Sequence, residues 1–306
     1  MYDYVLKRLG HMVFTIFIVS LIVFFLVRLK GDPISVMAPP TFSEAQVDAL
    51  RRAWGLDRPL HEQYIVFVSR AITGDFGRSV ITGTPATELV LQRLGGTLKL
   101  AGISALVALL IAIPAGVISA IRRNTYIDLI ITTFATMGTA MPNFWIGLIL
   151  ILIFSVNLRW LPAFGAEHPS ALIMPALTLG TSLAAQTARL SRSSMLEVLG
   201  QDYIRTAQSK GLSKRNVVWR HAFRNSLIPV ITAFGLQLGW LLGGSVVVEA
   251  VFAWPGLGRL MIEAINVRDI TVVQAGVLWF AITFILINLI VDLTYRLIDP
   301  RIDLRS

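Results

Sequence analysis

Six long apolar stretches limit what this chain can fold into. They cover residues 11–29, 97–121, 129–156, 171–190, 228–249 and 274–295. A helix needs about 20 apolar residues to cross the roughly 30 Å hydrocarbon core of a bilayer, and these stretches have that length. The mean hydropathy of +0.70 and the charged fraction of 15% agree with lipid as the main solvent. We therefore expect an all-α polytopic membrane protein with six transmembrane helices.

The first stretch has features of both a signal peptide and a membrane anchor. It follows Lys7 and Arg8, as the apolar region of a signal peptide would. Its apolar run is too long for a signal peptide, and no small-x-small cleavage site precedes residues 30–33. We interpret residues 1–30 as a retained N-terminal anchor.

Lysine and arginine gather at alternate connections between the apolar stretches. The connection 189–225 carries eight basic residues against two acidic ones, and others lie at 7, 8, 122, 123, 296, 301 and 305. The connections 157–170 and 251–273 are nearly balanced. Because loops rich in Lys and Arg stay in the cytoplasm, we expect both termini to be cytoplasmic. The net charge of +9 is confined to these segments, so nucleic acid is not an expected partner.

The chain then divides into four regions. The anchor is followed by an extracytoplasmic helical region (31–96), a five-helix membrane domain (97–296) and a cytoplasmic tail (297–306). Within 31–96 we expect three short helices: one capped by Ser43 and Gln46, one from Asp57 to Gly74, and one from Thr84 that stops at Gly95.

The basic connection has a helical design of its own. A helix should run over 197–210 and stop at Gly211, after which Ser213 should cap a second helix over 214–226. Pro229 should then start the next span. One stripe of the second helix is apolar and the opposite face is polar: Val218, Trp219, Ala222, Phe223 and Leu227 against Asn216, Arg220, Arg224 and Asn225. Such a helix can dock into a groove on a partner or rest on anionic headgroups.

The stretch "DYIRTAQSKGLSKRNVVWRHAFRNSLIPV" resembles the EAA-type cytoplasmic loop of ABC-importer permeases, in the form found in the dipeptide/oligopeptide/nickel branch. The segments "KGDP", "WGLDRPL", "GDFGRS", "GGSVVVEAVFAWPGLGRL" and "RD" resemble the same branch at consistent spacing over nearly the whole chain. The resemblance implies a type I importer permease fold, with a coupling loop at 191–227. It also implies contacts with an ATP-binding subunit by Arg205, Thr206, Ala207, Gly211, Leu212, Ser213, Lys214, Val217 and His221.

The same resemblance implies the surroundings of the chain. A permease of this branch lies in the bacterial inner membrane with a second homologous permease, two ATP-binding subunits that hold ATP and Mg²⁺, and an extracytoplasmic binding protein. The implied cargo is a dipeptide, an oligopeptide or a glutathione-like solute; nickel chelates and opines are alternatives. A secondary transporter that needs no ATPase is the competing hypothesis. It predicts a carboxylate deep within a span, and the sequence indicates none.

The sequence lacks the usual signatures of catalysis. It has no G-x-x-x-x-G-K-[ST] phosphate loop, no H-E-x-x-H and no G-x-S-x-G, and it contains no cysteine. The four histidines are scattered. We expect no catalytic residues, no metal site and no cofactor bound by this chain, and therefore not an enzyme.

Several residues within the spans are candidates for special roles. Polar residues recur along the third and fourth spans, where they line a passage or bond their own helix carbonyls and join helices. A small-xxx-small pattern in the fifth span favours close packing, against a partner permease or within this chain. Glu249 should lie at the solvated outer end of that span, while Asp292 and Arg296 should form an ordinary helix ion pair. Pro114 and Pro142 should kink their helices. The polar candidates are Thr132, Thr136, Thr139, Asn143, Thr178, Ser182 and Gln186, and the glycines are Gly235, Gly239 and Gly243.

Overall fold

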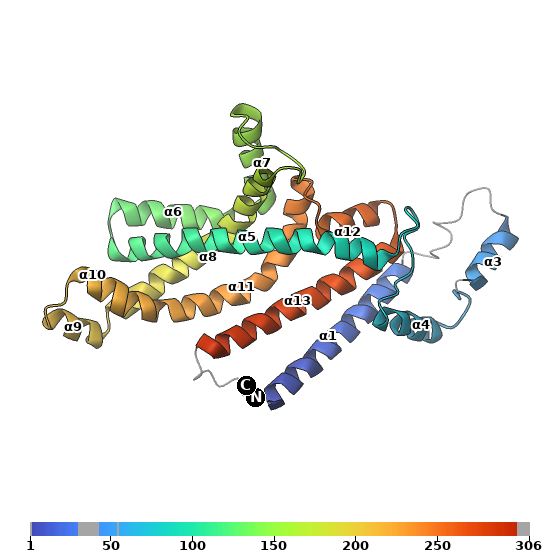
Figure 1. The fold of residues 1–306 in the computed structure, drawn as a ribbon, viewed down its shortest axis with the longest axis horizontal. Helices are drawn as coiled ribbons and strands as arrows, with labels where there is room; N and C mark the ends of the chain where they lie inside the picture. The colour runs from blue at the N-terminus through green and yellow to red at the C-terminus, as the bar shows by residue number, and fades with distance from the viewer. Residues whose placement is uncertain (1, 30–42, 54, 299–306) are drawn as a thin grey trace. The chain divides into compact units, whose positions relative to one another are not determined.

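The computed structural model describes residues 2–29, 43–53 and 55–298 (Figure 1). The "KGDP" segment, Trp54, most of the expected tail and the side chain of Arg296 lie outside the described residues. Within them the regular elements are helices, apart from a single bridge between Arg78 and Pro85. In chain order the helices before the broken third span are α1 (Tyr2–Leu29), α3 (Glu44–Ala53), α4 (Leu60–Ile72) and α5 (Ala86–Ile121).

The remaining helices complete the membrane domain. They are α6 (Tyr126–Ala140), α7 (Asn143–Leu150), the π-helix η1 (Ile151–Asn157), the short 3-10 helix η2 (Pro169–Leu172), α8 (Ile173–Leu199), α9 (Asp202–Ser209), α10 (Lys214–Asn216), the π-helix η3 (Val217–Ala222), α11 (Phe223–Val251), α12 (Leu257–Asn266) and α13 (Ile270–Ile298).

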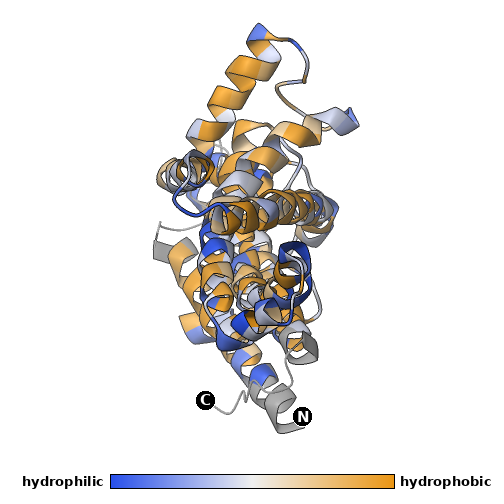
Figure 2. Ribbon diagram, turned by 90° about the vertical axis from the view of Figure 1, so that its left-hand side faces the viewer, coloured by the Kyte–Doolittle hydropathy of each residue, from blue (hydrophilic) through white to orange (hydrophobic). Residues whose placement is uncertain are grey.

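Four helical segments in the described part are long and apolar enough to cross a membrane: Ala86–Ile121, Pro169–Leu199, Lys214–Val251 and Ile270–Thr294. A bent helix pair adds a fifth candidate, and the apolar part of α1, Gly10–Leu26, is shorter than these. Figure 2 shows the hydrophobic colour along the long helices and the hydrophilic colour mainly in the connecting segments. The polytopic all-α fold is confirmed, whereas six spans and cytoplasmic termini stay predictions.

The third expected span is not one helix. α6 ends at Ala140, α7 begins at Asn143, and the two arms are bent by 110°. Met141 is extended, with φ −85° and ψ 131°, because the ring of Pro142 disfavours the helical conformation of the preceding residue. The kink expected at Pro142 is therefore a complete break.

α5 corrects one further expectation. The helix does not stop at Gly95, because α5 runs without a break from Ala86 to Ile121 and joins the expected extracytoplasmic helix to the second span. Gly95 and Gly96 weaken a helix by about 1 kcal/mol each, and packing of the flanking apolar residues outweighs this cost. Pro114 lies inside α5, and the helix continues past it, so the kink expected there stays a prediction.

The contacts of the chain divide it into two units. Of the described residues, unit 1 comprises those within 2–96 and 256–286, and unit 2 comprises those within 97–255 and 287–298. In unit 1, Phe24 of α1 packs edge-on against Tyr64 of α4, with ring centroids 5.2 Å apart. A second cluster joins the start of α5 with α12 and α13 through Val90, Leu257 and Ala275.

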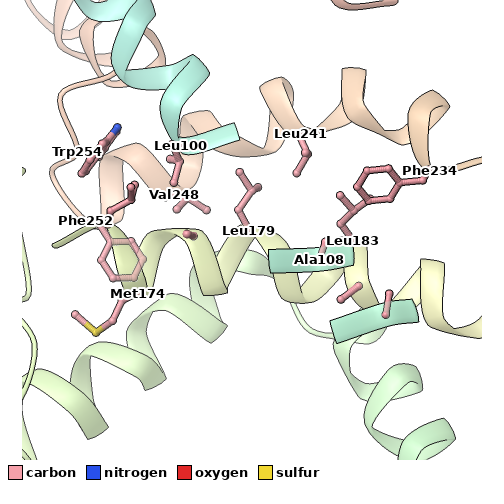
Figure 3. Packing of buried hydrophobic residues seen from close by; sticks show 14 of the residues in the cluster. Leu100, Ala108, Met174, Leu179, Leu183, Phe234, Leu241, Val248, Phe252 and Trp254 are labelled. Carbon is pink, nitrogen blue, oxygen red and sulfur yellow. The ribbon is translucent and has the colours of Figure 1, made fainter. Parts of the chain in front are cut away.

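The core of unit 2 lies between α5, α8 and α11. Leu179 and Leu183 of α8 lie in one buried cluster with side chains of the two neighbouring helices (Figure 3). These are Leu100 and Ala108 of α5, and Phe234, Leu241 and Val248 of α11. Two glycines let the helices approach closely. A Cβ atom added at Gly116 would lie 2.5 Å from Ser191 Cβ, and one at Gly180 would lie 2.8 Å from Ser104 O. α8 is thus the central helix of this unit.

Candidate coupling element and translocation site

The basic connection forms a helical tip at one end of α8 and α11 (Figure 1). We call residues 202–216, which contain α9 and α10, the coupling tip. The expected continuous helix over 197–210 is wrong, because α8 ends at Leu199 and the extended Gln201 separates it from α9. Gly200 at this position has a low helix propensity, which favours the break.

The turn between α9 and α10 agrees with the sequence. Gly211 has φ +78°, the left-handed conformation that glycine adopts without steric cost. Ser213 is the N-cap of α10, and its hydroxyl oxygen accepts a 3.4 Å hydrogen bond from Asn216 N. The expected stop and the expected cap are both confirmed.

The helix after Ser213 does not end before the fifth span. It runs continuously from Lys214 to Val251, with a π-helical segment at Val217–Ala222, so the expected boundary at Pro229 is wrong. Pro229 lies inside α11. A proline within a helix costs about 3 kcal/mol, and the packing of this segment against α8 and α9 offsets that cost.

Seven buried side chains anchor the coupling tip to the membrane domain. They come from the ends of α5 and α8, from α9, and from η3, and they form one cluster: Val117, Ala120, Met195, Ile204, Ala207, Val217 and Ala222. A further hydrogen bond of 3.0 Å joins Asn225 Nδ2 of α11 to the Tyr203 hydroxyl of α9. The tip is thus packed against the ends of α5 and α8 and hydrogen-bonded to α11.

The expected contacts with an ATP-binding subunit fall into two groups. Ala207 and Val217 are 7% and 2% exposed, so in this structure they pack inside the protein and are not surface residues. His221 is half-buried. The exposed members lie together on the tip: Arg205, Thr206, Gly211, Leu212, Ser213 and Lys214.

The expected apolar stripe of the following helix is partly buried. Ala222 is fully buried and Phe223 is half-buried, whereas Trp219 is 52% exposed and stacks edge-on against Phe223 at 5.2 Å. The opposite face is exposed as expected, with Asn216, Arg220, Arg224 and Asn225.

Threonines of α6 form a polar surface in the membrane domain. Thr132, Thr133, Thr136 and Met137 line a shallow hollow of about 260 Å³. The hydroxyl of Thr132 donates to Asp128 O at 2.7 Å, and that of Thr136 donates to Thr132 O at 2.9 Å. Their oxygen lone pairs stay available to a solute. Thr139 also bonds to its own helix.

The other polar candidates do not share this face. Asn143 begins α7 beyond the bend, and its Nδ2 atom lies near Gly244. Thr178 is fully buried and its hydroxyl donates to Met174 O of the same helix at 2.8 Å, so it lines no open surface. Ser182 is half-buried and Gln186 is exposed.

The glycine pattern of the fifth span is also divided. Gly235 and Gly239 are buried, whereas Gly243 is exposed and no atom lies within 4 Å of the Cβ position that a side chain would occupy there. A close approach is found at the neighbouring Gly244, whose added Cβ would lie 3.2 Å from Leu179 Cδ1. The burial of Gly235 and Gly239 favours packing within the chain.

A buried ion pair near the coupling tip was not anticipated. Arg192 of α8 donates from Nε and Nη2 to the two carboxylate oxygens of Asp128 at 2.8 Å each. The residues are 64 positions apart, and Asp128 precedes the expected third span, so no short-range pattern links them. A lone acidic residue beside the basic 122–123 turn was the available signal.

Glu249 also differs from expectation. Its side chain is 0% exposed, and Thr97 Oγ1 donates to Glu249 Oε1 at 2.7 Å, so the carboxylate is not solvated at the end of the span. Asp292 is likewise buried. In the described part of the chain, no group of three His, Cys, Asp or Glu residues could hold a metal ion.

Comparison with known proteins decides the family. The model of the binding-protein-dependent transport system inner membrane component matches residues 112–304, and the model of its N-terminal region matches residues 1–101. The chain belongs to this family. It is a multi-pass permease of the bacterial inner membrane, from the peptide/nickel branch of ABC importers.

Full-length relatives support the same assignment. The chain is 45% identical over 303 residues to the glutathione transport system permease protein GsiC of Escherichia coli strain K12, covering 99% of each chain. The GsiC protein of Shigella dysenteriae serotype 1 gives the same identity and coverage.

Solved structures show the same fold. The inward-facing MetNI methionine ABC transporter has a chain with a TM-score of 0.59 and 20% identity, covering 69% of this chain and 96% of that one. An amino acid ABC transporter with histidines gives a TM-score of 0.54 and 16% identity, covering 69% and 94%. The type I importer permease fold is therefore confirmed.

Proposed function

We propose that this chain forms half of the translocation pathway of an ATP-driven importer for glutathione or a similar small peptide. Relatives named glutathione transport permeases match it along 99% of its length, which supports this cargo class. The observation that carries the proposal is the coupling tip: exposed residues on α9 and α10 stand on a buried cluster that reaches α5, α8 and α11.

The proposed complex contains four further subunits. A second homologous permease completes the pathway, two ATP-binding subunits bind ATP and Mg²⁺ and hydrolyse the nucleotide, and an extracytoplasmic binding protein delivers the cargo. This chain then acts as a permease and not as an enzyme, and it binds no cofactor itself. Nickel chelates and opines are the alternative cargoes for the same architecture.

The proposed mechanism uses the tip as the receiver of mechanical work. When ATP brings the two ATP-binding subunits together, they move the tips, and the buried cluster passes the movement to the spans. ATP bound to the ATP-binding subunits can shift the complex between inward- and outward-facing states only if its affinity for the complex differs between the two states. The threonine surface of α6, with Thr132, Thr136 and Thr139, would then be exposed to alternate sides.

Two leucines of equal exposure provide a test of the docking surface. Leu212 on the tip and Leu158 after η1 are both 40% exposed. The change Leu212→Asn removes an apolar contact from the proposed interface, so the ATP-binding subunits should no longer co-purify with the permease. Leu158→Asn is the matched control and should retain them. Equal retention by both variants would contradict the proposed docking surface.

The buried Glu249 favours one competing function, a secondary transporter. A carboxylate buried in an apolar helix can serve as a proton site. The two functions differ in the energy source for uptake. Proteoliposomes with the complete complex should accumulate radiolabelled glutathione only with ATP inside, in the compartment that faces the coupling tips. Accumulation driven by a proton gradient without ATP, and lost in Glu249→Gln, would favour the secondary transporter.

Cargo identity is tested separately from the mechanism. The binding protein should bind glutathione in calorimetry more tightly than a nickel chelate or an opine. Tighter binding of either alternative would change the proposed cargo and leave the ATP-driven mechanism intact.

A further inference from the structure

The turn of α8 from residue 191 to 195 contacts α5, α6, α11 and the cluster that anchors the coupling tip. Ser191 lies against Gly116 of α5, where an added Cβ would be 2.5 Å from Ser191 Cβ. Ser194 Oγ donates to Ser226 O of α11 at 2.9 Å, and Met195 belongs to the cluster that anchors the tip. Arg192, in the same turn, binds Asp128 of α6. The turn is a junction of four helices and the tip.

Asp128 accepts more hydrogen bonds and is more buried than the carboxylate of the exposed Arg259–Glu263 pair. Its carboxylate accepts both bonds from Arg192, a bond of 2.5 Å from Ser119 Oγ, and one of 3.0 Å from Asn124 N. Asp128 is 5% exposed, and the Arg192 side chain is 26% exposed. The Arg259–Glu263 pair, in contrast, has side-chain exposures of 37% and 51%. A two-pronged arginine–carboxylate pair fixes the relative orientation of its helices as well as their distance.

The position of Asp128 links this junction to the threonine surface. Asp128 lies in the first turn of α6, and its carbonyl oxygen accepts the hydroxyl of Thr132. Thr136 follows one turn later on the hollow. A displacement of Asp128 therefore tilts the arm of α6 that carries these threonines, because a helix moves as a rigid segment.

Besides the ion pair, α6 is joined to the end of α5 by the short 122–125 connection and by the Ser119–Asp128 bond, and it packs against α8. Gly138 packs against Ala185 of α8, at the far end of α6 from Asp128, and this contact is apolar. Apolar contacts allow helices to slide by small amounts, whereas two parallel hydrogen bonds between charged groups do not. The ion pair thus ties the tip end of α6 to α8 with a fixed geometry.

We propose that Asp128 and Arg192 are positioning residues that couple movement of the tip to α6. Arg192 moves with α8, and Asp128 transmits that movement to the threonine surface. This inference rests on the proposed function, because it assigns a role within the ATP-driven cycle. Neither residue contacts cargo or nucleotide in this role.

The test compares uptake with ATP hydrolysis in the same proteoliposomes. They contain the complete complex and glutathione-loaded binding protein. The double variant Asp128→Asn with Arg192→Gln avoids leaving one buried charge without its partner. We expect the complex to assemble and hydrolyse ATP at close to the native rate, while the glutathione taken up per ATP falls about tenfold. A proportional fall of both activities, or an unchanged ratio, would overturn the inference.

A matched control separates this effect from the loss of any ion pair. Arg259→Gln with Glu263→Gln removes a pair of the same residue classes at an exposed place in unit 1 and should leave the ratio unchanged. Arg192→Lys keeps the positive charge but loses the two-pronged geometry, so its ratio should fall between those of the native protein and the double variant. A ratio equal to the native one in Arg192→Lys would show that charge alone suffices and would contradict the positioning role.

A second measurement works even if glutathione is not the cargo. The chain has no cysteine, so spin labels can be placed at cysteines introduced for Phe134 on α6 and Gln208 on α9, both exposed. In the native complex the distance between the labels should be narrowly distributed with and without ATP, because the ion pair holds α6 to the tip. In the double variant it should broaden and shift on ATP addition. An equally narrow and constant distance would overturn the inference, whereas absent glutathione uptake in the native complex would count only against the proposed cargo.

Discussion

Thr97 donates a 2.7 Å hydrogen bond to Glu249, and neither side chain has any exposed surface. The two residues are 152 positions apart, at the start of the unit 2 part of α5 and near the end of α11. A buried carboxylate is costly unless hydrogen bonds satisfy its oxygens, so this contact stabilises the packing of the two helices.

We expect Thr97→Val to lower stability by about 1–3 kcal/mol, because the isosteric change removes the donor of a hydrogen bond to the buried carboxylate. The measurement is the midpoint of thermal unfolding of the purified complex in detergent. Thr136→Val is the matched control, since the Thr136 hydroxyl is exposed and bonds its own helix, and it should shift the midpoint little. Equal shifts for both variants would contradict the stabilising role of the Thr97–Glu249 bond.

A pair of glycines tests the close packing of α5 against α8. Gly116→Ala places a Cβ atom 2.5 Å from Ser191 Cβ and 2.7 Å from Ala188 O, so we expect a net loss of about 1–3 kcal/mol through overpacking. Gly102→Ala lies on the same helix with no atom within 4 Å and should gain up to about 1 kcal/mol from helix propensity. Thermal unfolding of the two variants should therefore shift in opposite directions, and shifts of the same sign would refute the close approach.

The expected polytopic α-helical fold and the turn and cap of the basic connection could be predicted from the sequence because they depend on local patterns. Apolar stretches of sufficient length mark the spans, and Gly211 and Ser213 carry the turn and the cap within a few residues. The helix boundaries at Gly95 and Pro229 were wrong for the opposite reason. There, packing with distant helices outweighs local propensity, and a single sequence does not contain that information.

The missed side-chain contacts have the same origin. Asp128 and Arg192, like Thr97 and Glu249, lie on different helices, so their burial depends on how the helices cross. Position along a span predicted Glu249 to be solvated, whereas neighbouring helices cover it. Thr178 was assigned to a passage because it is polar, but its hydroxyl bonds its own helix inside the core. Polarity alone does not separate these cases.

Two segments that resemble the peptide branch meet in unit 1. Ser79, from "GDFGRS", donates to Asp269 Oδ2 at 2.5 Å, and Asp269, from "RD", accepts from Val272 N at 3.3 Å with Oδ1. Asp269 therefore caps α13 and holds the 75–85 turn at once. We expect Asp269→Ala to expose that turn to protease, measured by limited digestion of the purified complex in detergent.

Asp75→Ala is the control for the Asp269 prediction. Asp75 accepts a 2.9 Å bond from Gly77 N in the same turn, but its side chain is exposed and ties the turn to no other element. Digestion should remain slow in this variant. If both variants were digested equally fast, contacts within the turn would be what protects it from protease. That result would contradict the role of the Ser79–Asp269 bond.

The last prediction concerns the shape of the third span, which is broken at Met141 and Pro142. Pro142→Ala removes the ring that keeps Met141 extended and restores an N–H group, so a continuous helix from α6 into α7 becomes accessible. Spin labels at introduced cysteines replacing Leu129 and Val156, which are 61% and 57% exposed, report the angle between the arms. With Pro142 the arms are bent by 110°, and the alanine variant should show a second, longer distance between the two labels.

The matched control is Pro114→Ala with labels at Leu98 and Ile118. Because α5 already continues past Pro114, the distance between these labels should not change. A single unchanged distance in Pro142→Ala would show that packing, and not proline, bends the span.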